Sequence, residues 1–434
     1  MKVRAYTLGC KVNQYESEAM LSMLCDSGMR KAEKGEKADV VIINSCTVTA
    51  QSDQKVRQTL RRAKKDNPDA VAVLTGCMVQ AFPEESEALP EADIIIGNSG
   101  RKNLCGYIMD FISTRNRIVD IKSHENGEKF EEMKVSSYSE RTRAFVKIED
   151  GCNRFCSYCI IPYARGRVRS KPLSDLKAEI AELAANGYRE IVLTGINLSC
   201  YGQEFGLHLC DAVEAACEAE GVERVRLGSL EPEQLSPEVI ERLAKQKKLC
   251  PQFHLSLQSG CDETLKRMNR HYSADEYREI VKNLRAAFDN AAITTDIMVG
   301  FAGETDEEFE KNLDFAKEIS FAKVHVFAYS RRPGTRAYDA PGQVTQRVKE
   351  LRSRRMIEAT LETQQNFFDE QTGRTEPVLI ERETSPGIYE GYTRNYTPVK
   401  IKAEAGMSIK GSIVDVLING KDESGCLGCL ARKN

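Results

Sequence analysis

The sequence contains no long hydrophobic run, and this absence excludes a large class of proteins. Nowhere in its 434 residues does an apolar stretch approach the ~18 residues that a membrane helix needs. The opening segment, MKVRAYTLGC, lacks the apolar centre of a secretory signal peptide. We therefore expect a cytoplasmic protein that is not attached to a membrane.

The chain also lacks a strong excess of one charge. Its formal net charge is -3 and its pI is near 6.1, so the overall field gives no support for binding to nucleic acid, and any such site must be local. We find no internal repeat and no low-complexity tract. Hydrophobic residues make up 41% and charged residues 29% of the chain, which is typical of a soluble globular protein with two or three domains at this length.

Cysteine, in contrast, is plentiful, with 15 residues. Disulfides are rare in cytosolic proteins, where sets of cysteines more often indicate metal sites or catalysis. The spacing of the cysteines is therefore the most informative feature of the sequence.

The pattern of apolar runs predicts an α/β protein in three parts joined by one linker. Residues 1–113 alternate β-rich and helical runs, which predicts a domain with a parallel sheet. A polar linker is expected over residues 114–138. Residues 139–370 contain six apolar runs, the first five each followed by a helical pattern, as in an open, partial (βα)6 barrel of the TIM type with its chemistry at the carboxyl ends of the strands. Short β-rich runs in residues 371–434 predict a small antiparallel barrel.

The first cysteine set, Cys152, Cys156 and Cys159, lies in the segment GCNRFCSYCIIPYARG, directly after the first strand of the second part. Three thiolates at this spacing can hold one iron-sulfur cluster and leave one iron of a four-iron cluster open to a substrate. The alternative is a zinc site, which normally needs four protein ligands. The next candidates, Cys200 and His208, belong to a different βα unit, so the spacing favours the cluster.

This segment resembles the cysteine motif of the radical S-adenosylmethionine enzymes. The resemblance implies that the first cysteine set is catalytic and that its open iron binds S-adenosylmethionine, whose reductive cleavage yields a 5′-deoxyadenosyl radical. It also implies contacts to this cofactor from residues at the strand ends, although each of them has an ordinary position at a barrel mouth as its alternative. The implied contacts are Tyr158 beside the adenine, Gly195 and Asn197 near the methionine, Glu231 and Gln258 near the ribose and methionine, and Val299, Gly300 and Phe301 against the adenine.

The second cysteine set, Cys10, Cys46 and Cys77, is spread over TLGCKVNQYESE, NSCTV and LTGCMVQ, but each cysteine directly follows an apolar strand. The carboxyl ends of neighbouring parallel strands meet at one edge of a sheet, where such folds place ligands. We therefore expect these thiols to converge on a second cluster. Their alternative is packing, the role we expect for Cys25 and Cys105, because a free cysteine behaves as a small hydrophobic side chain.

Two cysteine sets in this order, followed by a small barrel, resemble the methylthiotransferase family across essentially the whole chain. The resemblance implies two 4Fe-4S clusters and two molecules of S-adenosylmethionine, one as methyl donor and one as radical source. It also implies an electron donor such as flavodoxin or ferredoxin. Radical chemistry suits an unactivated C–H bond, which is neither acidic nor electrophilic enough for side-chain acid-base catalysis. The immediate source of the sulfur stays open.

The last part of the chain resembles the TRAM domain, an RNA-binding module, most clearly in GYTRNYTPVKIK. The resemblance implies RNA contacts through phosphate-binding side chains and one stacking ring, and a solvated barrel face is the alternative. The implied residues are Arg394, Asn395, Tyr396, Lys400 and Lys402. Two basic helical segments add mild support: Arg57, Arg61, Arg62, Lys64 and Lys65, and Arg347, Lys349, Arg352, Arg354 and Arg355.

The segment TLGCKVNQYESE resembles the subgroup that acts on N6-threonylcarbamoyladenosine beside the tRNA anticodon. We therefore expect methylthiolation of C2 of this nucleoside in the anticodon loop, giving 2-methylthio-N6-threonylcarbamoyladenosine. Three alternatives stay open: isopentenyladenosine in tRNA, an aspartate of a ribosomal protein, and a noncatalytic iron-sulfur RNA-binding protein. The segment GCLGC, with Cys426 and Cys429, departs from the family pattern; it is either an incidental exposed pair or a labile metal or redox site.

Overall fold

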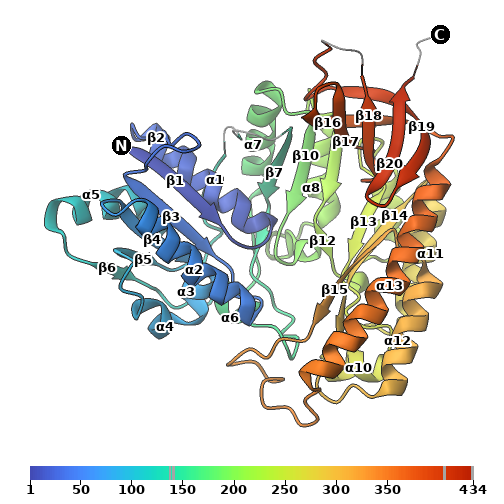
Figure 1. Ribbon diagram of the computed structural model, residues 1–434, viewed down its shortest axis with the longest axis horizontal. Helices are drawn as coiled ribbons and strands as arrows, with labels where there is room; N and C mark the ends of the chain where they lie inside the picture. Colours follow the sequence, from blue (N-terminus) through green and yellow to red (C-terminus); the bar gives the residue numbers. More distant parts are fainter. Residues whose placement is uncertain (136–137, 139–141, 404–406, 432–434) are drawn as a thin grey trace.

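A computed structural model describes residues 1–135, 138, 142–403 and 407–431. The chain forms an N-terminal domain, a central half barrel and a C-terminal barrel, coloured from blue to red in Figure 1. This confirms the expected α/β class and the three-part architecture. None of the helices in the described ranges is long and apolar enough to cross a membrane.

The N-terminal domain is built on a parallel sheet in the order β2-β1-β3-β4-β5-β6. Strands β3 and β4 are buried along their whole length, as expected of a parallel sheet with helices on both faces. The strands are β1 (Lys2–Thr7), β2 (Arg30–Lys31), β3 (Val40–Ser45), β4 (Val71–Gly76), β5 (Ile94–Ile96) and β6 (Ile118–Asp120). The helices are α1 (Lys11–Asp26), α2 (Ala50–Asp66), α3 (Cys77–Ala81), α4 (Pro83–Glu87) and α5 (Leu104–Thr114).

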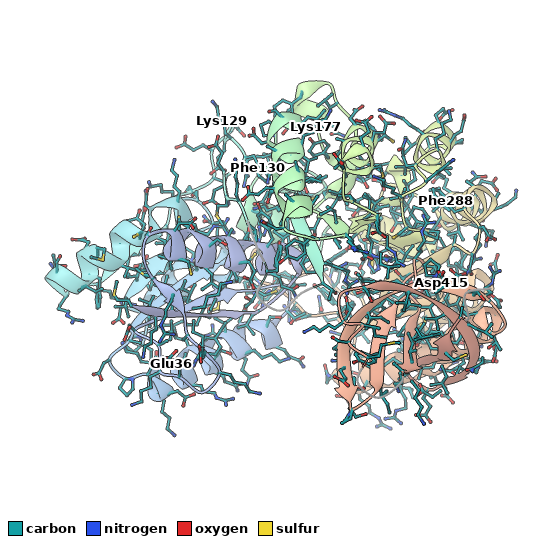
Figure 2. All side chains as sticks on the ribbon, turned by 90° about the horizontal axis from the view of Figure 1, so that it is seen from above. Glu36, Lys129, Phe130, Lys177, Phe288 and Asp415 are labelled. Carbon is teal, nitrogen blue, oxygen red and sulfur yellow. The ribbon has the colours of Figure 1, made fainter. Side chains whose placement is uncertain are left out.

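The segment expected as a linker, residues 114–138, is part of the fold. Its strand β6 pairs in parallel with β5 and extends the sheet. Further along, Phe130, Met133 and Val135 are buried, and Figure 2 labels Phe130 between the N-terminal domain and the half barrel. Polar composition hid this role because β6 is only three residues long and lies at the edge of the sheet. Residues 136–137 lie outside the described residues.

The half barrel consists of parallel strands in the spatial order β7, β10, β11 with β12, β13, β14 and β15. Only Gly228 separates β11 from β12, and a bridge from Val225 to Leu249 joins the two sheets. Helices α11, α12 and α13 cover its outer face, whereas its concave face looks toward the N-terminal domain (Figure 1). The strands are β7 (Arg143–Lys147), β10 (Glu190–Thr194), β11 (Arg224–Leu227), β12 (Ser229–Leu230), β13 (Gln252–Leu255), β14 (Ala292–Val299) and β15 (Lys323–Ala328).

Helices follow most of these strands, as predicted. They are α6 (Ile161–Arg165), α7 (Leu173–Ala185), α8 (Leu209–Glu218), α9 (Pro237–Ala244), α10 (Asp262–Arg267), α11 (Ala274–Ala287) and α12 (Asp306–Ile319). A short antiparallel pair, β8 (Glu149–Asp150) and β9 (Arg169–Ser170), encloses the first cysteine set. The long helix α13 (Gln346–Gln371) then leads to the C-terminal barrel.

The C-terminal barrel is closed by five strands in the order β16-β17-β18-β20-β19. All neighbours are antiparallel except β18 and β20. The strands are β16 (Thr375–Ser385), β17 (Ile388–Tyr392), β18 (Pro398–Lys402), β19 (Ile413–Asp422) and β20 (Gly425–Leu430). The closing strand β20 contains the GCLGC segment, so the feature that departed from the family pattern completes the barrel.

The two cysteines of β20 do not form a site together. Cys426 is fully buried in the barrel interior, whereas Cys429 is exposed. Successive residues of a strand point to opposite faces, so residues that are three positions apart, as Cys426 and Cys429 are, lie on different faces. The opposite placement of the two thiols does not support a shared metal or redox site, which is one of the two alternatives for this segment, and because Cys426 is buried they are not an exposed pair either.

Candidate active site

The first cysteine set lies in the loop after β8, at the carboxyl ends of the half-barrel strands. Gly151 has φ +84°, and a side chain there would lie 2.0 Å from the carbonyl oxygen of Arg167, so glycine is required for this turn. The amide of Cys152 donates to the carbonyl of Gly166, 3.0 Å away. Each thiol is an electrostatic neighbour of the others. The loop thus brings Cys152, Cys156 and Cys159 together.

Nitrogen donors point at the sulfur atoms of this set. Asn197 Nδ2 lies 3.6 Å from Cys152 Sγ, and Arg270 Nη1 lies 3.4 Å from Cys156 Sγ. Burial raises the pKa of the Cys152 thiol to about 12 and also raises the pKa of Cys159, to which the neighbouring Cys156 adds. Enclosed thiols of this kind become thiolates when a metal centre supplies the compensating charge. The donor set therefore fits a cluster.

The spacing of the thiols also bears on the zinc alternative. Throughout the described ranges, no three or more His, Cys, Asp or Glu side chains are grouped closely enough to hold a single metal ion. A four-iron cluster places its thiolate ligands on different irons and so accepts a wider spacing. The described residues therefore give no support to a zinc ion held by either cysteine set.

A buried carboxyl group, which sequence reasoning missed, lies behind the expected methionine contacts. Glu149 Oε2 accepts a hydrogen bond from the backbone N–H of Asn197 at 2.6 Å, and a side chain at Gly195 would approach this oxygen to 2.7 Å. Burial raises the pKa of Glu149 well above its usual value. Glu149 Oε1 and Asn197 Oδ1 are buried acceptors without a partner among the described residues. They fit a ligand that carries N–H groups beside the thiols, as the amino group of S-adenosylmethionine does.

The expected ribose and methionine contacts come from the next strand ends. Glu231 forms an ion pair with Arg270 at 2.5 Å, and the same guanidinium reaches Cys156, so the arginine connects the carboxylate to the first cysteine set. Gln258 has φ +66°, and its backbone bridges to Ile297 of β14. Arg270 was not predicted, and the only signal in the sequence is its position soon after α10.

A cluster of three aromatic rings lies at the carboxyl ends of the strands, beside the first cysteine set. The ring of Tyr158 meets Phe301 edge to face at 6.3 Å, and Phe301 meets Tyr329 at 5.0 Å. Phe301 and Val299 are buried, whereas Tyr158 is half-buried. Gly300 has φ +68° and donates its N–H to Glu304. The structure thus brings all eight expected cofactor contacts to the carboxyl ends of the half-barrel strands.

The second cysteine set lies at the carboxyl edge of the N-terminal sheet. Cys10, Cys46 and Cys77 follow β1, β3 and β4, which are neighbours in the sheet. A side chain at Gly76 would lie 2.5 Å from the carbonyl oxygen of Ser45, which explains the glycine before Cys77. The three thiols are electrostatic neighbours, and burial raises the pKa of Cys77 to about 12. The expected convergence is therefore present.

Asn13 orders the turn around Cys10. Its Oδ1 accepts a hydrogen bond from Cys10 Sγ at 3.2 Å, while its Nδ2 donates to the Ser45 carbonyl at 2.9 Å. Asn44 returns a hydrogen bond to the backbone oxygen of Asn13. The amide network thereby ties the turn after β1 to the turn after β3.

One buried arginine links the two cysteine sets. Arg165 ends α6, shortly after the first set, and its Nε donates to Cys77 Sγ at 3.2 Å. Its Nη1 binds Glu16 Oε1 of α1 at 2.8 Å and Asp150 Oδ1 at 3.0 Å. The side chain is completely buried. Arg165 stands in the segment that carries the first set, but the sequence gives no sign of its partners across the domain boundary.

Further charges complete this buried network. Lys147 binds Glu16 at 2.9 Å and also Asp150, and Arg101 binds Glu16 at 2.9 Å. Burial alone would raise the pKa of Glu16, but the charges of Arg101, Arg165 and Lys147 outweigh it and hold the pKa well below its usual value. Buried ions are tolerated only when every partner is present. The network therefore fixes the N-terminal domain on the half barrel.

A second set of contacts between the N-terminal domain and the half barrel lies beside Cys46. Arg332, in the segment YSRRPGTRA after β15, donates from Nη2 to Thr47 Oγ1 and to Asp53 Oδ2, both at 2.7 Å. Its guanidinium also lies 4.9 Å from the ring of Phe82. The turn that carries Cys46 is thus held against the half barrel.

Comparison with known proteins identifies the family. Residues 2–97 match an uncharacterized protein family, UPF0004, and residues 146–316 match the Radical SAM superfamily. The chain is 38% identical over 422 residues to the threonylcarbamoyladenosine tRNA methylthiotransferase MtaB of Bacillus subtilis (strain 168), which covers 96% of this chain and 93% of the relative. The chain belongs to the radical S-adenosylmethionine methylthiotransferase family. The family and the enzyme class predicted from the cysteine motifs are confirmed.

Other relatives of this methylthiotransferase carry two different names. The Thermotoga maritima protein, also named threonylcarbamoyladenosine tRNA methylthiotransferase MtaB, is 36% identical over 430 residues, 99% of this chain and 97% of that protein. A tRNA-2-methylthio-N(6)-dimethylallyladenosine synthase of Pelotomaculum thermopropionicum is 35% identical over 427 residues, 96% and 95% of the two chains. Among solved structures, the radical S-adenosylmethionine methyltransferase TsrM from Kitasatospora setae matches with a TM-score of 0.58 at 15% identity, covering 78% of this chain and 77% of that one. This likeness shows a shared fold.

Three residues expected to bind RNA instead fasten the C-terminal barrel of the methylthiotransferase to its half barrel. Arg394 donates to the backbone oxygens of Lys247 and Leu249 at 2.6 and 2.8 Å. Asn395 is buried and donates to the backbone oxygen of Asn290 at 3.2 Å. These contacts are intramolecular and give both side chains a structural role, so they do not support the expected phosphate contacts, which stay a prediction.

Tyr396 has the same docking role. Its ring stacks on Tyr392 at 4.5 Å, and the guanidinium groups of Arg143 and Arg226 lie 4.9 and 4.6 Å from it. The stacking ring expected for RNA is therefore covered by arginines of the half barrel. Sequence reasoning assigned it to RNA because the same residue types serve both purposes.

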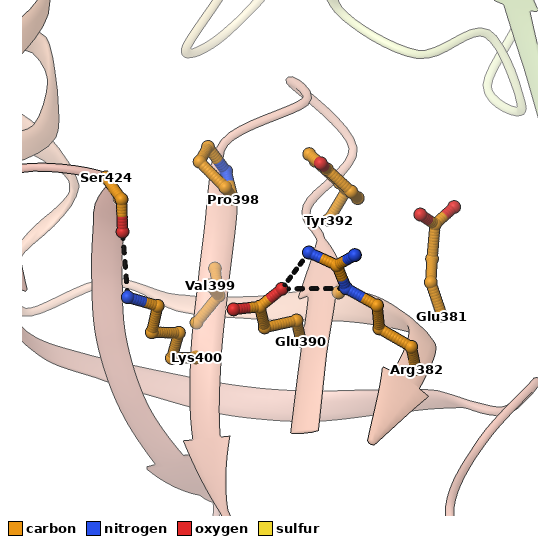
Figure 3. A pocket seen from close by; sticks show the side chains of 10 residues that line it. Glu381, Arg382, Glu390, Tyr392, Pro398, Val399, Lys400 and Ser424 are labelled. Atoms are coloured by element: carbon orange, nitrogen blue, oxygen red, sulfur yellow. Dashed lines mark hydrogen bonds and ion pairs between the residues drawn. The ribbon is translucent and has the colours of Figure 1, made fainter. Parts of the chain in front are cut away.

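The remaining two candidates lie on the barrel surface. Lys400 Nζ binds Asp422 Oδ2 at 2.7 Å and Ser424 Oγ at 2.8 Å, beside a pocket of about 300 Å³ (Figure 3). Figure 3 also shows Arg382 paired with Glu390 in this pocket. Lys402 is exposed. Of the five candidates, only Lys402 keeps an exposed cationic side chain without a carboxylate partner among the described residues.

The basic helical segments are also largely engaged within the protein, which weakens the support they gave. In α2 the ion pairs are Arg57 with Glu85, Arg61 with Glu91, Arg62 with Asp66 and Lys64 with Asp93. In α13 they are Arg352 with Glu304 and Asp306, and Arg355 with Glu310. The prediction for Cys105 is confirmed, since it packs against the hydrophobic core.

Proposed function

We propose that this methylthiotransferase modifies C2 of N6-threonylcarbamoyladenosine next to the anticodon of tRNA, giving 2-methylthio-N6-threonylcarbamoyladenosine. Two molecules of S-adenosylmethionine serve as methyl donor and radical source. The observation that carries the proposal is the pair of cysteine sets, held at adjoining sheet edges by the buried Arg165. Full-length similarity to relatives named for this reaction supports the substrate.

Each cysteine set has its own task in this proposal. Cys152, Cys156 and Cys159 hold the 4Fe-4S cluster of the radical enzymes, and Cys10, Cys46 and Cys77 hold a second 4Fe-4S cluster. When bound, these groups supply the one-electron chemistry that no side chain can perform. Asn197 and Glu149 accept hydrogen bonds from the amino group of S-adenosylmethionine through the acceptors that have no other partner, and Tyr158 lies against its adenine.

The proposal includes partners that the cell must supply. A small electron carrier, such as flavodoxin or ferredoxin, reduces the enzyme in the cytoplasm. The tRNA anticodon loop reaches the concave face of the half barrel, and the exposed Lys402 of the C-terminal barrel contributes a phosphate contact. Arg394, Asn395 and Tyr396 hold that barrel in place.

Dimethylallyladenosine is the second candidate substrate, because a relative named for it is 35% identical over 96% of this chain. The two reactions share the methylthiolated carbon and differ in the group on N6. One group carries a carboxylate, whereas the other is a neutral hydrocarbon. Discrimination between them therefore depends on the charges that face the substrate.

One experiment tests the reaction and the substrate together. The protein is reconstituted anaerobically with iron and sulfide and given S-adenosylmethionine, a reductant and tRNA from cells that lack the activity. Mass spectrometry of the digested nucleosides is expected to show 2-methylthio-N6-threonylcarbamoyladenosine. A methylthiolated dimethylallyladenosine would move the protein to the second candidate. 5′-Deoxyadenosine without a modified nucleoside would overturn the proposal and direct attention to protein substrates.

A further inference from the structure

Lys11 lies over the concave face of the half barrel. It directly follows Cys10 at the start of α1, and its electrostatic neighbours are Arg143, Arg226 and Glu190. His325 has Lys11 among its own neighbours. These four groups stand on β7, β11, β10 and β15, which are different strands of the half barrel. Lys11 therefore faces charged side chains from several strands of the half barrel, although it belongs to the N-terminal domain.

The charge of Lys11 is not paired with any residue that the structure describes. Among the described residues, no hydrogen bond or ion pair engages its Nζ, and the residue is exposed. Its nearest carboxylate, Glu190, is already shared by Arg226 at 2.9 Å, Arg224 at 3.5 Å and Arg143 at 3.7 Å. Lys11 is thus a cation that a ligand can reach and that no side chain in the described ranges neutralises.

Strand β15, which carries His325, is suited to a nucleobase. On β15 the alternating residues Lys323, His325 and Phe327 are exposed, and Phe327 keeps 48% of its surface accessible. An exposed aromatic ring is available for stacking, and single-stranded RNA bases bind to proteins in this way. The carboxylate of Asp296 is held by His254 at 3.4 Å. A flipped base stacked on this strand would therefore lie near Lys11, which is an electrostatic neighbour of His325.

We propose that Lys11 binds the carboxylate of the threonylcarbamoyl group and so sets the preference for a carboxylated N6 substituent over a neutral one. This inference rests on the proposed function and names the residue that selects its substrate. An ion pair beside the low-dielectric protein is stronger than one in open water, and a neutral hydrocarbon would leave the ammonium of Lys11 without a counter-charge. Discrimination arises from both effects.

The test compares two anticodon stem-loop RNAs. One carries N6-threonylcarbamoyladenosine, and the other carries its methyl ester, which has the same shape without the charge. Binding to the reconstituted full chain is measured by fluorescence anisotropy under anaerobic conditions. The wild-type protein is expected to bind the acid about ten- to hundredfold more tightly than the ester. Lys11→Gln should bind both equally, and Lys11→Arg should keep most of the preference.

Lys34→Gln is the matched control, because Lys34 is an exposed lysine of the same domain, and it should keep the full preference. Iron and sulfide content shows whether Lys11→Gln still holds its clusters beside Cys10. If Lys11→Gln loses iron, the test rests on the wild-type protein and Lys11→Arg. Both should bind the acid-bearing RNA more tightly than the ester-bearing RNA.

Equal binding of acid and ester by the wild-type protein would overturn the inference, as would a preference that survives in Lys11→Gln. Failure of the proposed function gives a different result: the wild-type enzyme would form no methylthio product from the acid-bearing RNA, however tightly it binds. Product formation with no role for Lys11 would remove only this inference.

Discussion

Cys152, Cys156 and Cys159 come from one loop, whereas Cys10, Cys46 and Cys77 come from three turns that only a folded sheet brings together. The first set depends on local backbone geometry, above all on the turn at Gly151. The second set depends on the order of β1, β3 and β4, and its Cys77 contacts Arg165 of the half barrel. Substitutions between the N-terminal domain and the half barrel should therefore disturb iron binding by the second set more than by the first.

The two sets also differ in the charges around them. The first set has Arg270 as its cation, paired with Glu231. The second set has Arg165, which is shared with Glu16 and Asp150 in the buried network. Loss of Arg165 would thus leave the buried carboxylates of Glu16 and Asp150 with one positive charge fewer. The first set would keep Arg270. Substitutions in and around the two sets test this difference.

The largest effect is expected from removing one cysteine of each set. Cys156→Ala should abolish formation of 5′-deoxyadenosine, because the first set holds the centre that cleaves S-adenosylmethionine. Cys46→Ala should still form 5′-deoxyadenosine but give no methylthio product. Chromatography of both products measures the two steps separately. Cys25→Ala, at a half-buried cysteine outside both sets, serves as control, and normal methylthiolation by Cys46→Ala would refute the role of the second set.

Arg165→Met is expected to have the next largest effect. The variant leaves Glu16 and Asp150 buried with one cation fewer, which costs about 3 to 5 kcal/mol in the free energy of unfolding. Urea denaturation measures this loss, and iron analysis should show that the second set loses iron before the first. Arg189→Met removes an exposed pair with Glu223 and should cost roughly 0 to 1 kcal/mol. Equal effects of the two variants would contradict the role given to the network.

Glu149 and Asp150 are neighbours in the sequence, and their pKa values are shifted in opposite directions. Burial raises the pKa of Glu149 well above 4.5, so the folded protein holds a proton that the unfolded chain has lost, and stability falls as the pH rises from 4.5 through the folded-state pKa. Glu149→Gln removes this dependence. In the cluster-free protein, its stability relative to wild type should therefore improve from about pH 5 to pH 8.

Asp150→Asn provides the contrast. Burial would raise the pKa of Asp150, but Lys147, Arg165 and Arg169 outweigh it and hold the pKa below its usual value. Its stabilising contribution is therefore present above pH 3.8 and is lost as the pH falls, so the substitution should destabilise the protein at neutral pH. Thermal unfolding at each pH measures the stability of Glu149→Gln and of the wild type. If the difference between them did not change with pH, Glu149 would not have the raised pKa described.

The smallest effects are expected from the cysteines of β20. Cys426→Ala leaves a small cavity in the C-terminal barrel, at a cost of about 1 kcal/mol in the free energy of unfolding. Cys429→Ser changes an exposed side chain and should leave stability unaltered. Neither should change the iron content, in contrast to substitutions in either cysteine set. Loss of iron from Cys429→Ser would restore the metal interpretation of the GCLGC segment.

The sequence predicted the parts of the site that are local. The first cysteine set was visible from its spacing, and the second from the rule that parallel strands end at one edge. Arg165, Asp150 and Glu149 were not predicted, although they flank the first set, because their partners come from distant parts of the chain. No spacing pattern encodes a contact of that kind.

Other features of the structure were hidden from the sequence for a related reason. Arg394, Asn395 and Tyr396 have the chemistry of an RNA-binding surface, but the same groups can fasten one domain to another. Strands β6 and β20 were missed because they are short and contain polar or small residues that give no clear alternation. In both cases the tertiary environment, which the sequence pattern does not contain, decides the role.

The most direct test of the account is an iron count on two triple variants. Replacing all three cysteines of one set by alanine should leave the other set occupied, so each variant should hold about four iron atoms against about eight in the wild type. Mössbauer spectra should then separate two distinct clusters. If removal of Cys10, Cys46 and Cys77 left the iron content unchanged, the protein would have one cluster, and the central claim of two cluster-binding sets would be contradicted.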